Sequence, residues 1–431
     1  MEQNQTVCLL NDSFPPFIDG VANAVMNYAR HIPENGGSAI VITPDHPQAD
    51  DSRFPYPVVR YPSIDMRKKL GYMAGVPFSP EIANRLSQEN VALLHSHCPI
   101  ISTLMARQLR QIFDAPVVLT YHTKFDVEID SMVRGKLLQE GGRKILAENI
   151  SACDEVWTVS RGAGENLRGL GYEGDYIVMP NGVDLPRQRV EDSAIAAVTA
   201  GCDLPRSVPI YLFTGRIRWY KGLRIIIDAL AQLNAQGRDF RMVFIGEGAD
   251  LEEVRAYAHR CGVGHKCHFT GAIRDRDILR AWYCRADLFL FPSTFDTNGL
   301  VVREAAACSL ASVLISGSCA AEDVNNGHNG FLIEESAQSL AQCLLELQDN
   351  PEKMAAAGEA AARELYISWA SAVQNAARRY EIVIDRYKCG QYPRYRKPTE
   401  YYLKANGELM EDLGHLLKIR DQLKKHLRDL L

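Results

Sequence analysis

The chain has 431 residues, of which 46% are apolar and 23% are charged, and its formal net charge is −5. This length is about three times that of a common single domain and predicts two domains. The acidic balance disfavours a general nucleic-acid-binding protein, and no run of about 18 apolar residues predicts a membrane-spanning helix. The N-terminal sequence MEQNQTVCLL does not resemble a secretory signal, and eleven scattered cysteines without a C-x-x-C pair are typical of reduced thiols. We therefore expect a cytoplasmic protein.

Short apolar runs alternate with helical patterns over most of the chain. In the first half the predicted strands are Thr6–Leu10, Ser38–Thr43, Val58–Tyr61, Val91–His95, Pro116–Tyr121, Glu155–Ser160 and Tyr176–Met179. In the second half they are Pro209–Thr214, Arg241–Ile245, Cys267–Thr270, Asp287–Phe291, Ser312–Ile315 and Phe331–Ile333. Continuous apolar runs of this length are typical of parallel strands buried on both faces. The pattern predicts an α/β protein with two doubly wound parallel sheets, in residues 1–185 and 207–367, joined by a linker at 186–206.

The tail, residues 390–431, begins with the connector GQYPRYRKP and continues as a predicted amphipathic helix. Its leucines follow a 4–3 spacing that Arg420 interrupts: Leu409, Leu413, Leu416, Leu423, Leu427 and Leu430. The pattern favours a helix packed on the body of the protein. Two alternatives stay open, a coil that forms a homodimer and a basic helix on an anionic membrane surface.

Two cations lie where a strand of the second half ends. In YLFTGRIRWYKGL, Arg216 and Lys221 lie on either side of a turn after the strand Pro209–Thr214. Ligands of doubly wound sheets bind in the crevice at this end of the strands. The two cations suit a diphosphate, although a solvated face would show the same residues.

A second segment, FPSTFDTNGLVVREAAA, follows the strand Asp287–Phe291. A helix is predicted from about Leu300, and the backbone amides at its start can bind an anion. Asp296 and Glu304 lie eight residues apart on either side of that start. Carboxylates there suit the hydroxyls of a sugar or ribose; the alternatives are a helix cap for Asp296 and an exposed position for Glu304.

Together these segments resemble the retaining glycosyltransferases of family 4, which have the GT-B fold, over about residues 6–385. The most specific element is G-R-x(4)-K-G at residues 215–222, followed by an acid-x(7)-Glu element at Asp296 and Glu304. Supporting motifs are FPPFIDGVANAV, HSH, TYHT, ACDEVWTVS, MPNGVD, IGEGADL and GHNGFLI. The segment TYHTKFDVEID also looks like bacterial diacylglycerol glycosyltransferases.

The resemblance implies a role for each matching residue. Arg216 and Lys221 would hold the diphosphate, and Glu304 would accept hydrogen bonds from the ribose. Asp296 and the backbone of Asn298, Gly299 and Leu300 would contact the donor sugar. Gly20 would bring backbone close to the β-phosphate, His122 would contact the sugar, and Ile273 would offer backbone to the base.

The resemblance also implies the architecture and the reaction. Two Rossmann-like domains would face a cleft, the first binding the acceptor and the second the nucleotide sugar, and a helix at 368–389 would return to the first domain. The reaction would be retaining transfer of a hexose from a UDP-sugar, without a cofactor or a metal ion. Two departures stand out: Asp296 replaces the usual glutamate, which leaves the donor sugar open, and Ser309-Leu310-Ala311 replaces a Gly-Leu-Pro turn.

For the acceptor side we single out a basic run, Arg67, Lys68 and Lys69, beside apolar residues, together with His97. Charge next to apolar surface suits an amphiphilic acceptor such as diacylglycerol, which would place the protein peripherally on the inner face of the plasma membrane. A cell-wall or polysaccharide precursor and a small metabolite are the alternative acceptors. The alternative for the basic run is a solvated loop without a binding role. The alternative for His97, and also for His95, is a structural histidine that forms hydrogen bonds inside the protein.

Three competing interpretations remain open. The D-x-D of Asp275-Arg276-Asp277 is the metal-binding signature of another transferase fold, but here a helix cap explains it better. A silent sugar-nucleotide-binding protein of the same fold would lack catalysis although it binds the donor. A nucleotide-sugar epimerase would release free sugar and need no acceptor.

Overall fold

The computed structural model describes residues 5–17, 19–67, 73–125, 135–205, 207–393 and 398–430. The chain divides into two compact units. Unit 1 comprises Met1–Pro180 and Trp369–Leu431, and unit 2 comprises Asn181–Ser368. Each unit is described by itself below.

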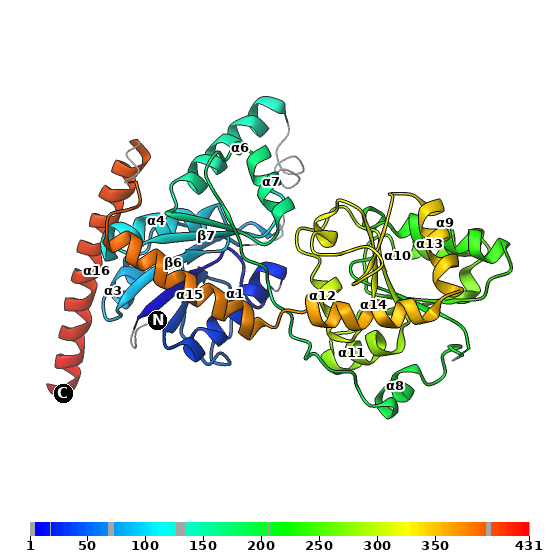
Figure 1. The fold of residues 1–431 in the computed structure, drawn as a ribbon. Coiled ribbons are helices and arrows are strands. Elements are labelled where there is room, and N and C mark those ends of the chain that lie inside the picture. The colour runs from blue at the N-terminus through cyan, green and yellow to red at the C-terminus, as the bar shows by residue number, and fades with distance from the viewer. Residues whose placement is uncertain are drawn as a thin grey trace. The chain divides into compact units, whose positions relative to one another are not determined.

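Unit 1 is built on a seven-stranded parallel sheet in the order β3-β2-β1-β6-β7-β8-β9 (Figure 1). Its strands are β1 (Thr6–Leu10), β2 (Ser38–Pro44), β3 (Val58–Tyr61), β6 (Val91–Ser96), β7 (Val117–Tyr121), β8 (Glu155–Thr158) and β9 (Ile177–Val178). A short antiparallel pair, β4 (Ser63–Asp65) and β5 (Met73–Gly75), follows β3. The strand order reverses between β1 and β6, so the carboxyl ends of these two strands flank the point where ligands of such sheets bind.

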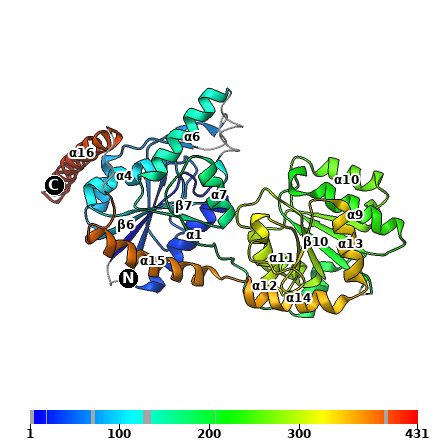
Figure 2. The same ribbon diagram turned by 45° about the horizontal axis from the view of Figure 1, so that its top comes forward.

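Helices cover both faces of this sheet, and Figure 2 shows α1 and α15 on one side and α4 and α6 on the other. The helices are α1 (Gly20–His31), α3 (Pro80–Leu86), α4 (Ile101–Phe113), α6 (Lys136–Ser151), α7 (Arg161–Gly169), α15 (Trp369–Lys388) and α16 (Pro398–Leu430), with a 3₁₀ turn at Pro33–Asn35. Local sequence sets several starts: Asp19 caps α1 by accepting a hydrogen bond from the Ala22 amide, and Ser160 caps α7 in the same way.

The C-terminal helix α16 packs on α3 and α4. The residues that meet these helices are Leu403, Gly407, Met410 and Gly414. The structure therefore places the tail on the body, as the sequence favoured, but through a different face from the expected one. Leu409 and Leu416 of the predicted leucine stripe are exposed.

Unit 2 contains a six-stranded parallel sheet in the order β12-β11-β10-β13-β14-β15. Its strands are β10 (Ile210–Thr214), β11 (Arg241–Ile245), β12 (Cys267–Gly271), β13 (Leu288–Phe291), β14 (Ser312–Ile315) and β15 (Phe331–Ile333). Its helices are α8 (Asp192–Thr199), α9 (Leu223–Ala235), α10 (Leu251–Arg260), α11 (Arg276–Arg285), α12 (Leu300–Ala307), α13 (Ala337–Gln348) and α14 (Pro351–Glu364), with 3₁₀ turns at Trp219–Lys221, Gly264–Lys266 and Cys319–Ala321. Residues 181–206, expected as a domain end and a linker, belong to unit 2, where α8 packs on α11. Here the strand order reverses between β10 and β13.

None of the helices in the described ranges combines the length and the hydrophobicity of a membrane-spanning segment.

The turn after α12 carries local strain. Ser309 occupies the left-handed region with φ 56°. It stands at the glycine position of the Gly-Leu-Pro turn that is usual in the family 4 glycosyltransferases. This conformation costs a non-glycine residue about 1–2 kcal/mol, which a glycine would not pay. Part of this stabilisation is offset because glycine also gives the unfolded chain more conformational entropy. Ser309→Gly is expected to stabilise unit 2 by about 0.5–1 kcal/mol, as urea unfolding would measure. Ser309→Ala keeps the strain, so an equal gain in that variant would contradict the explanation.

Candidate functional site

The carboxyl ends of β10 and β13 position the predicted donor-binding residues of unit 2. The loop after β10 runs from Gly215 to Gly222 and contains Arg216 and Lys221. The loop after β13 runs from Pro292 to Gly299 and leads into α12. The sheet thus brings together two segments that are about 75 residues apart in sequence, at the reversal point where doubly wound sheets bind ligands.

Glycine allows these loops to approach closely. Gly222 has φ 76°, and a Cβ atom there would lie 1.9 Å from the carbonyl oxygen of Pro292. Gly246, after β11, has φ 143°, and its Cβ would lie 1.9 Å from the carbonyl oxygen of Gly215. Any larger residue at either position would push the β10 loop away from its neighbours.

Lys221 is 8% exposed and forms an ion pair with Asp296, with 2.5 Å between Nζ and Oδ1. The hydroxyl of Ser293 donates to the other carboxylate oxygen of Asp296 at 2.6 Å. The rings of Tyr220 and Phe295 lie 5.6 and 5.7 Å from the Lys221 ammonium group. The cation predicted for the diphosphate and the carboxylate predicted for the sugar therefore hold each other in place, a pairing that the sequence did not reveal.

Arg216 is exposed, and it forms no ion pair with any residue that the structure describes. Its guanidinium group can therefore bind an anion without first breaking an ion pair. The helix α12 begins nearby at Leu300, after Gly299 with φ 58°, and no side chain caps this start. The amide nitrogen of the Asn298 side chain is buried without a hydrogen-bond partner among the described residues, so a hydrogen-bond donor stands ready at this helix start.

Glu304, on α12, is buried and has both carboxylate oxygens bound. Arg276 donates to Oε1 at 2.7 Å, and the Tyr283 hydroxyl donates to Oε2 at 3.0 Å. Burial, together with the Glu304 carboxylate, raises the pKa of Tyr283 well above its usual value, so this hydroxyl stays a donor. Sequence reasoning missed both partners, because they come from α11 and no spacing relates them to α12.

The D-x-D segment is a helix cap, as predicted. The Asp275 carboxylate accepts hydrogen bonds from the amides of Asp277 and Ile278 at 2.9 and 3.0 Å. Within the part of the chain that the structure describes, no group of three or more His, Cys, Asp or Glu residues could hold a metal ion. Ile273, expected to offer backbone to the base, follows β12 and packs against the core of unit 2.

In unit 1 the candidate histidines form one buried cluster behind the ends of β6 and β7. His95 bonds the Tyr380 hydroxyl at 2.6 Å and the Thr120 hydroxyl at 2.7 Å, which confirms it as a structural histidine. His97 Nδ1 lies 3.0 Å from His122 Nε2, and the two rings stack. Burial lowers the pKa of His122 to about 3, and that of His95 and His97 well below the usual value. The three rings are therefore neutral at physiological pH, and His122 interacts as a dipole rather than as a cation.

The other unit 1 residues singled out from the sequence lie at the carboxyl ends of the strands. Gly20 is the first residue of α1, and a Cβ there would meet no atom within 4 Å, so the fold itself does not require glycine. Arg67 is paired with Asp65 at 2.7 Å and lines a cavity of about 40 Å³ with Asp12, Thr43 and Met73. The hydroxyl of Thr43 is buried there without a hydrogen-bond partner among the described residues. Lys68 and Lys69 lie outside the described residues, and the acceptor roles of Arg67 and His97 stay predictions.

Comparisons with known proteins agree with this arrangement. Residues 18–187 match the model for Glycosyltransferase Family 4, and residues 203–364 match the model for Glycosyl transferases group 1. D-inositol 3-phosphate glycosyltransferase of Xylanimonas cellulosilytica is 31% identical over 233 residues, which span 52% of this chain and 55% of that relative. Alpha-monoglucosyldiacylglycerol synthase of Acholeplasma laidlawii is 20% identical over 80% of this chain and 88% of its own length. Among solved structures, Anabaena Alr3699/HepE in complex with UDP is similar in fold, with a TM-score of 0.71, 18% identity and coverage of 88% of this chain and 100% of that one.

Proposed function

Because the chain belongs to the glycosyltransferases that join a Family 4 domain to a group 1 domain in a GT-B fold, we propose that it transfers a hexose from a UDP-sugar to an acceptor with retention of the anomeric configuration. The observation that carries the donor part is the ion pair between the buried Lys221 and the partly exposed Asp296 at the reversal point of the unit 2 sheet. A bound diphosphate can take the place of Asp296 as the partner of the Lys221 ammonium group. The Asp296 carboxylate can then accept a hydrogen bond from a sugar hydroxyl.

The proposed chemistry needs charge stabilisation above all. As the bond between sugar and diphosphate breaks, negative charge grows on the leaving UDP, and groups fixed around it lower the barrier. Lys221, Arg216 and the uncapped start of α12 supply positive potential at one place. Arg276 and Tyr283 donate to the two carboxylate oxygens of Glu304 and orient it, which suits a hydrogen-bond acceptor for ribose hydroxyls.

For the acceptor we propose a membrane lipid such as diacylglycerol, taken up at the inner face of the plasma membrane. Support comes from the Acholeplasma relative, which is named as a synthase of a glucosyldiacylglycerol, and from Arg67, which lines one cavity with the apolar side chains of Met73 and Phe17. A cation next to apolar surface fits the boundary between a lipid headgroup and its chains.

A donor screen that measures UDP release tests this function. We expect release from a UDP-hexose in the presence of diacylglycerol vesicles, with the sugar recovered on the lipid and an α-linkage if an α-donor is used. Release of GDP from GDP-mannose instead would overturn the proposed nucleotide. Free epimerised sugar would identify an epimerase, and binding of UDP-sugar without any turnover would identify a silent binding protein.

We further propose that turnover needs no divalent ion, because lysine, arginine and a helix start already supply the charge that Mg²⁺ or Mn²⁺ provides elsewhere. Transfer rates in excess EDTA are expected to stay within about twofold of the untreated rate. Loss of activity in EDTA that is restored by Mg²⁺ or Mn²⁺ would contradict this prediction.

A further inference from the structure

The C-terminal helix α16 has two different faces, and the body of unit 1 uses only one of them. The face against α3 and α4 follows a 3–4 spacing through Glu400, Leu403, Gly407, Met410 and Gly414. A Cβ on Gly407 would lie 3.2 Å from the Gln108 carbonyl oxygen, and one on Gly414 would lie 3.0 Å from that of Pro80. These glycines let the helix backbone lie directly on its neighbours.

A buried ion-pair network between α16 and α4 determines which face of α16 packs on unit 1. The Glu400 carboxylate accepts from Arg107 Nε at 2.9 Å and from Arg110 Nη2 at 3.4 Å. Both arginines are on α4, and all three side chains are buried. Turning α16 about its axis would take the Glu400 carboxylate away from Arg107 and leave Arg110 with Asp154 alone, and breaking a buried ion pair in this way is strongly destabilising. The orientation of the helix on unit 1 is therefore fixed.

The opposite face carries an exposed apolar stripe. Tyr402, Leu409 and Leu416 repeat every seven residues and are 69%, 49% and 61% exposed. Leu409 and Leu416 lie about 160–180° around the helix from Gly407 at 100° per residue. In the sequence Leu423 and Leu430 continue the same spacing, and Leu413 and Leu427 supply the alternate 4–3 positions. Figure 1 shows this helix at the edge of unit 1, with its C-terminal end extending past α3.

We infer that this stripe pairs with the same stripe of a second copy of the chain, as an antiparallel two-helix coil. The first position of the repeat is apolar in every heptad, and the position four residues later is apolar at Leu413 and Leu427 but polar at Asn406 and Arg420. Such a repeat makes a narrow seam, which fits another helix with the same repeat. A C2 dimer buries the same surface on both copies, so a single self-complementary stripe is enough.

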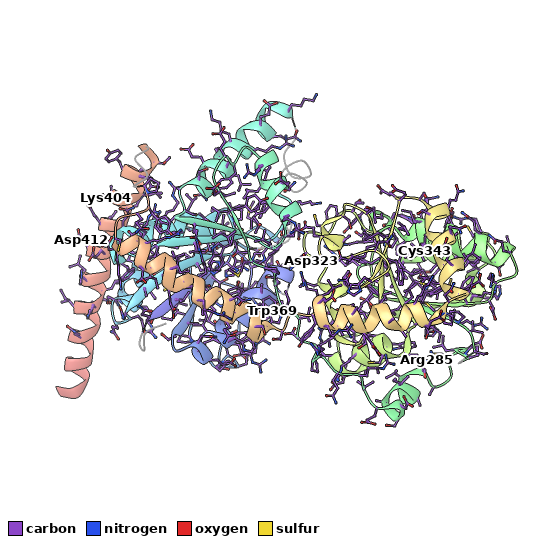
Figure 3. All side chains as sticks on the ribbon, viewed as in Figure 1. Arg285, Asp323, Cys343, Trp369, Lys404 and Asp412 are labelled. Atoms are coloured by element: carbon purple, nitrogen blue, oxygen red, sulfur yellow. The ribbon has the colours of Figure 1, made fainter. Side chains whose placement is uncertain are left out.

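The distribution of charge along α16 determines whether the two helices pair in the antiparallel or the parallel direction. Residues 399–412 contain four acidic residues and one basic residue, a net charge of −3. Residues 413–431 contain five basic and two acidic residues, a net charge of +3. Figure 3 labels Lys404 and Asp412 in the first of these halves. In an antiparallel pair whose two-fold axis passes the helical turn Leu413–Leu416, the acidic half of one helix lies beside the basic half of the other. Parallel pairing places like charges together.

The same charges argue against an anionic membrane as the occupant. Tyr402 and Leu409 lie in the acidic half, and Asp412 borders the stripe. Anionic lipid would repel this half, and a helix lying on a bilayer needs a wider apolar face than two positions per heptad.

Light scattering on the full chain tests the dimer. We expect the mass of two chains at micromolar concentration, and the mass of one chain for the double variant Leu409→Asp/Leu416→Asp. His415→Asp, which adds a charge on an exposed position of the same turn but off the stripe, is the matched control and should stay dimeric. A monomeric parent chain would overturn the inference. So would a double variant that stays dimeric with an unchanged melting profile.

Single cysteines test the direction in a Cys389→Ser background, which removes the exposed native thiol. In the antiparallel coil two copies of residue 402 lie about 35–40 Å apart at 1.5 Å per residue, whereas two copies of residue 416 are neighbours. Under mild oxidation Leu416→Cys is expected to crosslink and Tyr402→Cys is not. Crosslinking of both would show a parallel coil. Crosslinking of neither, together with binding of the parent chain to anionic vesicles that the Leu409→Asp/Leu416→Asp variant loses, would assign the stripe to a membrane instead.

Discussion

Replacement of Lys221 by methionine is expected to lower kcat/KM for sugar transfer by about 10²–10³-fold, the loss that follows removal of one fixed donor to a developing oxyanion. The ammonium group is buried and held by Asp296, and it would meet the leaving diphosphate when charge develops there. Methionine keeps the length and the apolar stem of the side chain and removes only the charge. Lys221→Arg should recover little, because a planar guanidinium group cannot replace a compact ammonium group beside the rings of Tyr220 and Phe295.

The experiment also needs a control for folding, because Lys221→Met removes the cation that pairs with Asp296 and leaves this carboxylate with the hydrogen bond from Ser293. The double variant Lys221→Met/Asp296→Asn removes both charges, so it should melt closer to the parent chain yet remain as inactive. Lys353→Met, on an exposed position of α14, is the matched substitution and should leave turnover unchanged. Turnover of Lys221→Met within threefold of the parent would overturn the donor site proposed for unit 2.

The sheets follow directly from the sequence, because buried parallel strands are uninterrupted apolar runs. The predicted strands Thr6–Leu10, Arg241–Ile245 and Phe331–Ile333 coincide with β1, β11 and β15. The β4–β5 pair was missed because its residues are partly exposed and its strands are only three residues long. Turn chemistry was also readable, since the Asp275 cap depends on residues only two and three positions away.

The partners of the site residues could not be read from the sequence. Arg276 and Tyr283 reach Glu304 only because α11 and α12 lie on the same face of the unit 2 sheet. Likewise, the leucine pattern of α16 predicted an amphipathic helix but not which face meets the body. Gly407 and Gly414 make that contact through close backbone approach, and a hydrophobicity pattern gives no weight to glycine.

Acidification is expected to destabilise unit 1 steeply, through the cluster of His95, His97 and His122. Each ring has a lowered pKa in the folded chain and the ordinary value of about 6.5 in the unfolded chain. Below pH 6.5 the unfolded chain therefore binds protons that the folded chain does not. The stability that these neutral rings contribute is complete above that pH and is lost as the pH falls. The loss approaches about 1.4 kcal/mol per pH unit for each ring, so three rings remove about 5 kcal/mol between pH 6.5 and 5.

Two buried carboxyl groups of unit 1 act in the opposite direction. Burial raises the pKa of Asp12 and Asp154, so their protonation favours the folded chain as the pH falls. The histidines prevail in the range from pH 6.5 to 5 because three rings take up protons there in the unfolded chain, whereas at most two carboxyl groups take up protons in the folded chain. Since whole domains are stable by only about 5–15 kcal/mol, the loss should be visible as acid unfolding of unit 1.

Urea unfolding of a Trp219→Phe/Trp282→Phe chain at a series of pH values measures this, because Trp157 and Trp369 then report on unit 1 alone. The free energy of unfolding should fall as the pH decreases, and His97→Gln should reduce the slope by about 1.4 kcal/mol per pH unit, the contribution of one ring. His265→Gln, on an exposed position of unit 2, is the control and should leave the slope unchanged. A free energy that stays constant from pH 7 to 5 would mean that these rings take up protons in the folded chain, and that His122 meets its ligand as a cation.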